Sequence, residues 1–250
     1  MKVISLGAGV QSTTMYLMSC YGELERADYA IFADTGWEPQ GVYDHLERLK
    51  ALNEIPIEVV TIGTLRERAL NNDNFAAMPL YTKDEKNKVS QLRRQCTREY
   101  KVAPLQKKIR SLGATAKNPA EVWIGISTDE VQRMKDSFVK YTYHRWPLID
   151  LRMDRQQCKA WLAEHWEHPV AKSACIGCPF HDDGFWQEMK DNRPDEWADA
   201  VEFDKAIRQM PRLRDQTFLH RSAQPLDEVV FSDQDQLDLF INECEGMCGI

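Results

Sequence analysis

The chain has 250 residues, a formal net charge of −7 and 43% hydrophobic residues. This length can bury a substantial core in one large domain, with or without an appended subdomain. The negative charge excludes a protein that simply coats nucleic acid, and no apolar run approaches the roughly 20 residues that span a bilayer. The first residues show no secretory signal pattern, so we expect a cytoplasmic protein with no membrane partner.

Short apolar runs alternate with helical periodicity up to about residue 168. Strands are predicted at residues 2–6, 29–33, 56–62, 121–126 and 146–150. Helices are predicted at residues 13–20, 39–53, 97–112 and 154–166. This alternation predicts a doubly wound α/β fold, with a mainly parallel five-stranded sheet and helices on both faces.

The strand pattern ends after residue 168. Helices packed on the sheet are predicted beyond it, at residues 184–192, 194–208 and 234–242. We therefore expect an α/β nucleotide-binding domain over residues 1–168 and a helical, cysteine-bearing region over residues 169–250. Residues 71–92 are polar with little periodicity, which predicts a mobile loop.

A turn of small residues lies between the first strand and the first helix. It consists of Gly7, Ala8, Gly9, Val10, Gln11, Ser12 and Thr13. Small residues let backbone N–H groups approach an anion, while the hydroxyls and the helix N-terminus add donors. The turn matches neither the Walker loop nor GxGxxG, and the competing interpretation is a plain tight turn. In strand–turn–helix order it predicts a phosphate site.

More polar side chains follow other strands at their carboxyl ends, where ligands of open α/β sheets bind. Asp34, Thr35 and Gly36 follow the second strand. The polar residues that follow the fourth strand are Ser127, Asp129, Glu130 and Arg133. The Asp34 carboxylate suits Mg²⁺ or a ribose hydroxyl, with a helix N-cap as the alternative. Arg133 suits a sulfate or phosphate group, which guanidinium binds bidentately; the alternative is an ion pair with a neighbouring carboxylate.

Cysteines cluster in three segments of the sequence. Cys96 lies in RRQCTREYKVAPL, Cys175 and Cys178 lie in SACIGCPFH, and Cys244 and Cys248 lie in ECEGMCGI. In a reducing compartment, clustered thiols are more often metal ligands or redox groups than disulfides. Iron–sulfur clusters normally take four thiolates. The pattern therefore predicts a 4Fe–4S cluster, with zinc or buried thiols without metal as alternatives.

Two other cysteines and one histidine are not expected to bind the metal. Cys20 and Cys158 lie on apolar faces of predicted helices, so we expect both in the core. His181 follows the CxxC motif, and we expect an exposed loop histidine. Three ligands, Cys96, Cys175 and Cys178, are assigned directly. The fourth is Cys244, Cys248, or an iron site left open to substrate sulfur.

Four segments in order resemble the phosphoadenylyl-sulfate and adenylyl-sulfate reductase family of the adenine-nucleotide α-hydrolase, or PP-loop, superfamily. GAGVQS resembles the SGGxDS pyrophosphate loop, with Gln11 in place of aspartate. FADTGWEPQGVYDHLERL resembles the strand-end DTG and the helix after it. CTREYKVAPL resembles the cysteine–basic–PL segment, and SACIGCP resembles the second cysteine pair. The resemblance covers most of residues 1–180.

The resemblance implies a nucleotide-binding iron–sulfur enzyme that reduces an adenylyl sulfate through a cysteine thiolate, with a thiol reductant such as thioredoxin. The chain departs from the family pattern at two places. Gln95 and Cys96 stand where the family has a cysteine pair, and ECEGMCGI replaces an ECGLH-like tail. One interpretation makes Cys244 the missing ligand and Cys248 the catalytic nucleophile, with Arg133 beside the sulfate.

Two other functions fit the same motifs. In the first, the loop binds ATP, with Mg²⁺, and an AMP-forming reaction activates a tRNA or DNA group that then receives sulfur from a donor. A basic stretch at residues 83–110, with ten basic and three acidic residues, fits such a polynucleotide. In the second, the protein is a non-enzymatic nucleotide-binding iron–sulfur sensor.

Overall fold

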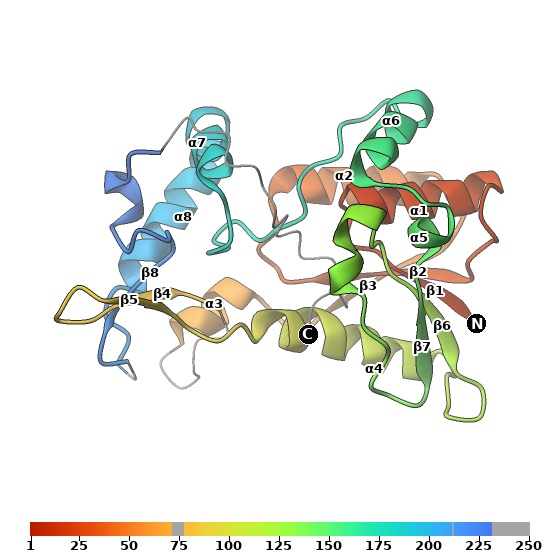
Figure 1. The fold of residues 1–250 in the computed structure, drawn as a ribbon, viewed down its shortest axis with the longest axis horizontal. Helices are drawn as coiled ribbons and strands as arrows, with labels where there is room; N and C mark the ends of the chain where they lie inside the picture. The colour runs from red at the N-terminus through yellow and green to blue at the C-terminus, as the bar shows by residue number, and fades with distance from the viewer. Residues whose placement is uncertain (72–77, 212, 232–250) are drawn as a thin grey trace. The chain divides into compact units, whose positions relative to one another are not determined.

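The computed structural model describes residues 1–71, 78–211 and 213–231 (Figure 1). Among the helices in these ranges, none is long and apolar enough to cross a membrane.

The described chain divides into two compact units. Unit 1 consists of Met1–Ile62 and Thr97–Ser173, and unit 2 consists of Gly63–Cys96 and the described part of Ala174–Asn242. The chain therefore leaves unit 1 after Ile62 and returns to it at Thr97. The sequence pattern had placed a single boundary near residue 168, because the segment before Thr97 carries too little periodicity to show that it belongs elsewhere.

Unit 1 is built on a five-stranded, all-parallel sheet, as the alternation of strands and helices predicted (Figure 1). Its strands are β1 (Lys2–Ser5), β2 (Tyr29–Asp34), β3 (Ile57–Thr61), β6 (Ala120–Trp123) and β7 (Thr142–Arg145). Their order across the sheet is β3-β2-β1-β6-β7. The order thus reverses between β1 and β6, and ligands of open α/β sheets bind beyond the carboxyl ends of the strands at such a switch point.

Helices cover both faces of this sheet. The helical segments of unit 1 are α1 (Val10–Tyr21), α2 (Gln40–Ala51), a π-helical turn (Thr97–Val102), α4 (Ala103–Ser111), a 3₁₀ segment (Thr128–Arg133), α5 (Pro147–Asp150) and α6 (Arg155–His165). Successive side chains of a strand point to opposite faces. Accordingly, Ile4 packs in a core cluster with residues of α1, α2 and α6, whereas Val3 packs in another with residues of α4. Figure 1 shows the same division of the helices.

Local sequence signals fix the ends of these helices. α1 ends at Gly22, whose φ of 83° is a left-handed conformation that costs glycine little. α6 begins with a capping box, in which the Asp154 side chain accepts from the backbone of Gln157 and the Gln157 side chain accepts from the backbone of Asp154.

The fifth strand lies earlier in the chain than predicted. Residues 146–150 were expected to form it, but Thr142–Arg145 is β7 and Pro147–Asp150 is the short helix α5. Pro147 takes the first helical positions of α5. Its missing N–H breaks no helical bond there, and its fixed φ suits a helix. The apolar residues after Trp146 therefore form a helical turn instead of a strand.

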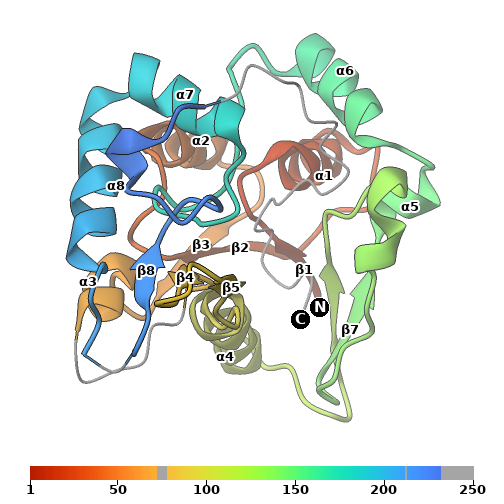
Figure 2. The same cartoon turned by 60° about the vertical axis from the view of Figure 1, so that its left-hand side comes forward.

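Unit 2 contains a three-stranded antiparallel sheet that the sequence pattern missed. Its strands are β4 (Tyr81–Lys83), β5 (Val89–Gln91) and β8 (Gln216–Phe218), in the order β5-β4-β8 (Figure 2). Part of the predicted mobile loop at residues 71–92 is therefore a hairpin, and residues 72–77 lie outside the described ranges. Three-residue strands show no usable periodicity, and β8 comes from a distant part of the chain.

Two helical segments of unit 2, at residues 183–192 and 194–206, follow the prediction closely, and two short ones were not predicted. These segments are α3 (Leu65–Leu70), α7 (Asp183–Asn192), α8 (Pro194–Ala206) and a 3₁₀ turn (Leu226–Glu228). α7 begins at Asp182, whose side chain accepts a 2.7 Å bond from the backbone N–H of Phe185. Arg66 joins α3 to α8 through an ion pair with Asp199 at 2.7 Å. The predicted helix at residues 234–242 lies outside the described residues.

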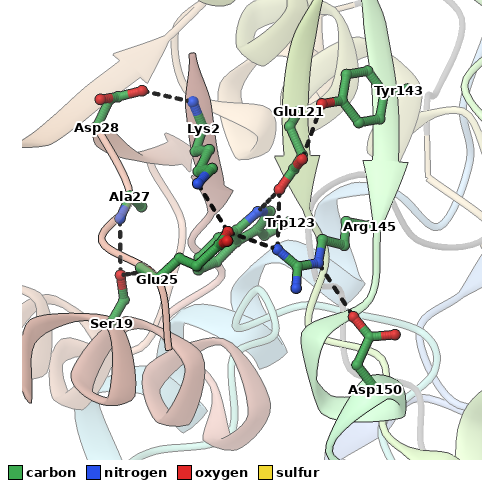
Figure 3. A network of polar contacts seen from close by, with 10 residues as sticks. All are labelled: Lys2, Ser19, Glu25, Ala27, Asp28, Glu121, Trp123, Tyr143, Arg145 and Asp150. Carbon is green, nitrogen blue, oxygen red and sulfur yellow. Dashed lines mark hydrogen bonds and ion pairs between the residues drawn. The ribbon is translucent and has the colours of Figure 1, made fainter. Parts of the chain in front are cut away.

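An ion-pair network braces the β1–β6–β7 side of unit 1 (Figure 3). Arg145 is at its centre, 3.0 Å from Glu25, 3.4 Å from Glu121 and 3.2 Å from Asp150. Lys2 also contacts Glu25, at 2.8 Å. The guanidinium of Arg145 thus links β7 to β6, to α5 and to the loop that follows α1.

Glu121 receives more bonds than any other carboxylate drawn in that network (Figure 3). Trp123 Nε1 donates to it at 2.6 Å and the Tyr143 hydroxyl donates at 2.9 Å. Burial opposes its ionisation, but the bonds from Trp123, Tyr143 and Arg145 outweigh burial and hold the pKa of Glu121 below its ordinary value. Its charge therefore stabilises the fold at neutral pH.

Replacing this carboxylate, Glu121→Gln, is expected to lower the free energy of unfolding at pH 7 by about 1–2 kcal/mol, because charge-assisted bonds to Arg145 and Tyr143 weaken. A carboxylate with a lowered pKa stabilises the fold above its unfolded pKa of about 4.3, and this contribution is lost as the pH falls through the folded pKa. The difference between variant and wild type should therefore shrink toward pH 3.

Urea unfolding at pH 7 and at pH 3–4 measures this difference. The control is Glu54→Gln, which removes an exposed partner of Arg26 and should change stability by less than about 0.5 kcal/mol. An equal loss for Glu121→Gln at both pH values would show that shape, and not charge, matters at this position.

Candidate functional site

The predicted phosphate turn leads from β1 into α1 and is buried from Gly7 to Thr13. Ala8 has a φ of 57°, a left-handed conformation that a residue with a side chain rarely adopts. Gly9 is extended, with φ −94° and ψ −177°, and precedes the first helical residue. Ser173 donates a hydrogen bond to the Gly7 carbonyl. Strained backbone of this kind persists where the surroundings fix it, and it is concentrated at ligand sites.

Most backbone N–H groups of this turn have no acceptor among the described residues. Gly7 N–H donates to the Ser12 hydroxyl at 3.2 Å, and Thr13 N–H donates to the Gly9 carbonyl at 3.0 Å. Between them, the N–H groups of residues 8–12 donate no hydrogen bond to any described residue. The first N–H groups of a helix have no partner inside the helix, and buried ones require an acceptor. An anion is the natural acceptor.

Gln11 joins this turn to the segment after β6. Its amide nitrogen donates to Ser127 Oγ at 3.3 Å and to Glu130 Oε2 at 3.1 Å, while its oxygen accepts from Arg155 Nη1 at 2.9 Å. Gln11 and Ser127 are fully buried and Glu130 is 3% exposed. The Gln11–Ser127 bond crosses the switch point between β1 and β6. The amide thus holds three segments of unit 1 together.

Arg133 forms an ion pair with Glu130, which is the alternative that the sequence left open. The Glu130 carboxylate therefore contacts both the Arg133 guanidinium and the Gln11 amide. Its predicted role at a sulfate stays a prediction.

Glu130 was expected near Ser127 because both follow the same strand, but sequence reasoning missed Arg155 as a member of this site. Arg155 is the first residue of α6, and its backbone N–H also donates to Asp129 Oδ1 at 3.1 Å. A cation in the first turn of a helix opposes the helix dipole. An arginine at this unfavourable position was the one sequence feature that could have indicated a role for Arg155 outside its own helix.

Asp34, Thr35 and Gly36 form a separate loop at the end of β2. Asp34 Oδ1 accepts from Gly36 N–H at 2.7 Å and from the Tyr43 hydroxyl at 2.9 Å. The N-cap position of α2 is Pro39, so the alternative interpretation of Asp34 as a helix cap is wrong. Burial, with a further contribution from Asp34, raises the pKa of Tyr43. Asp34 is thus a fixed acceptor that orders the loop.

A buried ion pair supports this loop from the other side of the sheet. Lys101 Nζ lies 3.3 Å from Glu38 Oε1, with side chains 5% and 0% exposed. Thr35 donates to the same oxygen of Glu38 at 3.0 Å. Lys101 belongs to the π-helical turn, and such turns are often found at functional sites. Removal of either charge alone would leave the other buried and uncompensated.

The basic stretch at residues 83–110 is not a uniform basic surface. Lys101 is buried as described, Lys108 pairs with Glu58 at 2.9 Å, and Arg110 lies over the Tyr141 ring at 5.2 Å. Several of its cations therefore have structural partners, which leaves fewer to meet a polynucleotide.

Three of the five cysteines discussed as ligands lie in the described part of the chain. Cys96, Cys175 and Cys178 belong to unit 2, whereas Cys244 and Cys248 lie outside the described residues. Cys178 N–H donates to the Cys175 carbonyl at 3.0 Å, which closes the CxxC turn. In the described ranges, no group of three or more His, Cys, Asp or Glu side chains is placed to hold a metal ion. The described thiols suit a cluster or zinc in kind, but they do not complete a site.

His181 is not the exposed loop residue that the sequence predicted. It is 4% exposed, its ring stacks on Phe185 at 3.7 Å, and its Nε2 lies 2.9 Å from the Cys175 carbonyl. The ring therefore donates to the CxxC turn and fixes its backbone. The expectation failed because proximity to a turn gives no information on the direction of the side chain.

Cys158 and Cys20 confirm the prediction of core positions. Cys158 is fully buried in the cluster around α1, α2 and α6, and Cys20 packs against the same cluster. Burial raises the pKa of the Cys20 thiol, which makes it a poor nucleophile.

The structure joins the residues predicted after β1 and β6 by direct bonds, while Asp34, Thr35 and Gly36 form their own loop after β2. No protein-family model matches the chain, and no curated protein matches its sequence.

Truncation of the central amide, Gln11→Ala, is expected to lower the free energy of unfolding by about 2–3 kcal/mol, because Ser127, Glu130 and Arg155 each lose a buried partner. Thermal or urea unfolding measures the loss. The matched control is Gln40→Ala, which removes an exposed amide that bonds Asp44 at 2.9 Å on α2 and should cost less than about 0.5 kcal/mol. Equal losses of stability in the two variants would contradict the proposal that Gln11 holds three segments of unit 1 together.

Proposed function

We propose that unit 1 binds the phosphates of an adenine nucleotide at the Gly7–Thr13 turn. We further propose that the protein is an iron–sulfur enzyme of the phosphoadenylyl-sulfate and adenylyl-sulfate reductase type, within the PP-loop superfamily. Its substrate is an adenylyl sulfate, its catalytic nucleophile is Cys248, and its partner is a thiol reductant such as thioredoxin.

The observation that carries the proposal is the set of backbone N–H groups at residues 8–12. They lie at the switch point of a parallel sheet, at the start of a twelve-residue helix, and they donate to no described residue. Several N–H groups and the helix dipole together favour a phosphate over any neutral ligand. The Ser12 hydroxyl, which accepts from Gly7 and donates to Gly9, fixes the conformation in which these N–H groups are held.

Gln11 favours an adenylyl sulfate over ATP as the substrate. The superfamily resemblance places an aspartate at this position, and carboxylate oxygens are the ligands that Mg²⁺ takes from proteins. The neutral amide of Gln11 instead uses both its nitrogen and its oxygen in bonds to Ser127, Glu130 and Arg155. A turn without a carboxylate supports chemistry that does not require a metal-bound triphosphate.

The proposed reaction occurs at the sulfur of the substrate. The thiolate of Cys248 attacks this sulfur, an S–S bond forms, the S–O bond to the phosphate breaks, and AMP leaves with the electron pair. A thiolate of the reductant then attacks Cys248 Sγ, which releases sulfite and leaves a mixed disulfide. Arg133 and Arg155 bring positive charge close to the turn, and guanidinium suits both sulfate and phosphate.

We include an iron–sulfur cluster in the proposal because of the cysteine motifs in the sequence. Cys96, Cys175 and Cys178 would be thiolate ligands and Cys244 the fourth, and the role of the cluster would be electrostatic and organising. Sulfur transfer to tRNA or DNA receives less support, because Lys101 and Lys108 of the basic stretch are already paired with carboxylates.

Calorimetric titration tests the nucleotide site. Wild-type protein is expected to bind adenylyl sulfate or 3′-phosphoadenylyl sulfate more tightly than ATP, and Ser12→Ala should weaken that binding about tenfold by loosening the turn. The matched control is Ser19→Ala at the other end of α1, where the hydroxyl braces the 25–27 loop through bonds of 2.7 and 2.9 Å. Binding unchanged in Ser12→Ala, or weakened equally in Ser19→Ala, contradicts the proposed site.

Turnover tests the nucleophile. Cys248→Ser is expected to reduce sulfite release from adenylyl sulfate by about a thousandfold or more, while nucleotide affinity and the iron and sulfide content of anaerobically purified protein stay at wild-type values. Cys20→Ala, which removes a half-buried core thiol, serves as the control. Retained turnover in Cys248→Ser, or loss of iron with it, would overturn the assignment of Cys248 as nucleophile.

A further inference from the structure

Thr13, the last residue of the phosphate turn, forms a buried polar pair with His45. Thr13 Oγ1 lies 2.9 Å from His45 Nε2, and both residues are fully buried. Thr13 belongs to the first turns of α1 and His45 to the middle of α2. The bond therefore joins the helix that follows β1 to the helix that follows the loop of Asp34, Thr35 and Gly36.

The surroundings of His45 keep its ring neutral. The His45 and Trp166 rings are nearly perpendicular, at a centroid distance of 5.9 Å. Burial, followed by the charges of Arg48 and His168, lowers the pKa of His45 to about 4. No carboxylate is among the groups that act on it. At neutral pH the ring therefore has one N–H and one bare nitrogen.

Counting protons shows that this pair has one donor too many. The Thr13 hydroxyl and the neutral imidazole each carry one donor proton, but a single hydrogen bond joins them. His45 Nδ1 has no hydrogen-bond partner among the described residues. One proton is therefore left over, either on His45 Nδ1 or on Thr13 Oγ1, depending on the tautomer.

The chemistry of the two atoms favours one tautomer. A buried N–H without an acceptor is rarer than a buried acceptor without a donor, so the proton belongs on Nε2 and the bare lone pair on Nδ1. Nε2–H then donates to Thr13 Oγ1. The remaining proton is the one on the Thr13 hydroxyl, which can rotate toward a new acceptor, whereas the ring cannot.

We propose that His45 is a positioning residue of the nucleotide site: its Nε2–H donates to Thr13 and leaves the Thr13 hydroxyl to donate to an oxygen of the bound nucleotide. This inference rests on the proposed function, because it needs a ligand at the Gly7–Thr13 turn. It adds a side-chain donor to the backbone N–H groups of residues 8–12. It also gives α2 a part in the phosphate site, since His45 holds the first turns of α1 in register with α2.

Two variants of each residue separate shape from hydrogen bonding. Thr13→Val and His45→Phe remove the polar groups, and each is expected to weaken binding of adenylyl sulfate about tenfold, the value of a hydrogen bond to a charged group. Thr13→Ser keeps the hydroxyl and His45→Gln keeps an N–H donor, so both should recover most of the affinity. The double variant Thr13→Val/His45→Phe should bind little worse than either single one.

The control is Thr14→Val, at the neighbouring position of α1. Thr14 is also fully buried, but its hydroxyl donates to the Val10 carbonyl at 2.8 Å within the helix. This change should leave nucleotide affinity within about twofold of the wild type, because the lost bond is local. A loss as large as that of Thr13→Val would assign the effect to packing and overturn the proposal.

The tautomer is measured directly by ¹⁵N NMR of the histidine side chains in the wild-type protein, with His45→Gln to assign the signal. Protonated Nε2 and bare Nδ1 are expected. Protonated Nδ1, or full affinity in both Thr13→Val and His45→Phe, overturns this inference while the nucleotide site stands. Wild-type protein that binds neither adenylyl sulfates nor ATP instead overturns the proposed function, whatever the tautomer.

Discussion

Unit 1 depends on one constraint: backbone N–H groups buried at the start of α1 must find acceptors. The protein meets part of this demand itself, through Ser12, Gly9 and the bond between Thr13 and Gly9. It leaves the N–H groups of residues 8–12 without acceptors among the described residues. Such groups are costly in isolation, so the surrounding structure must hold the turn in a conformation that the chain would otherwise avoid.

The bonds around the turn have this holding function. Gln11 ties it to the segment after β6 and to α6, and the Thr13–His45 bond ties it to α2. Ala8 in a left-handed conformation is tolerated because its neighbours determine it from several directions. The network of Arg145 and Glu121 plays a related part on the outer strands, where it holds β6 and β7 together. Rigidity at the switch point is thus distributed over side chains from α1, the segment after β6, α6 and α2.

The sequence predicted what depends on periodicity and local turn chemistry. Four of the five strands in unit 1, and α1, α2 and α6, follow from apolar spacing, and the turn at Gly7 follows from its small residues between a strand and a helix. Pairings between distant segments could not be predicted in the same way. β4 and β8 are three residues long and find each other only through the fold, and the apolar run at Pro147 has the composition of a strand but the start of a helix.

The candidate site shows the same division. Ser127 and Glu130 were found because they follow a strand, whereas Arg155 and His45 became visible only through their contacts. Each of these two is charged or titratable and lies in a helix, where sequence spacing alone indicates a surface position. Burial contradicts that indication for His45. A polar side chain in the interior has to be explained by its partners, and these partners come from other parts of the chain.

The division of the chain has a consequence for its synthesis. Unit 1 is interrupted by Gly63–Cys96, and β4 within that insertion pairs with β8 near the end of the described chain. As the polypeptide emerges from the ribosome, all the described strands and helices of unit 1 are available once Ser173 has left the tunnel, while the hairpin of β4 and β5 still lacks its third strand. Nascent chains therefore pass through a stage in which the edge of β4 is uncovered. Unpaired edges of this kind recruit other chains, so the interval between these two events is the period in which the nascent chain is most exposed to pairing with another chain.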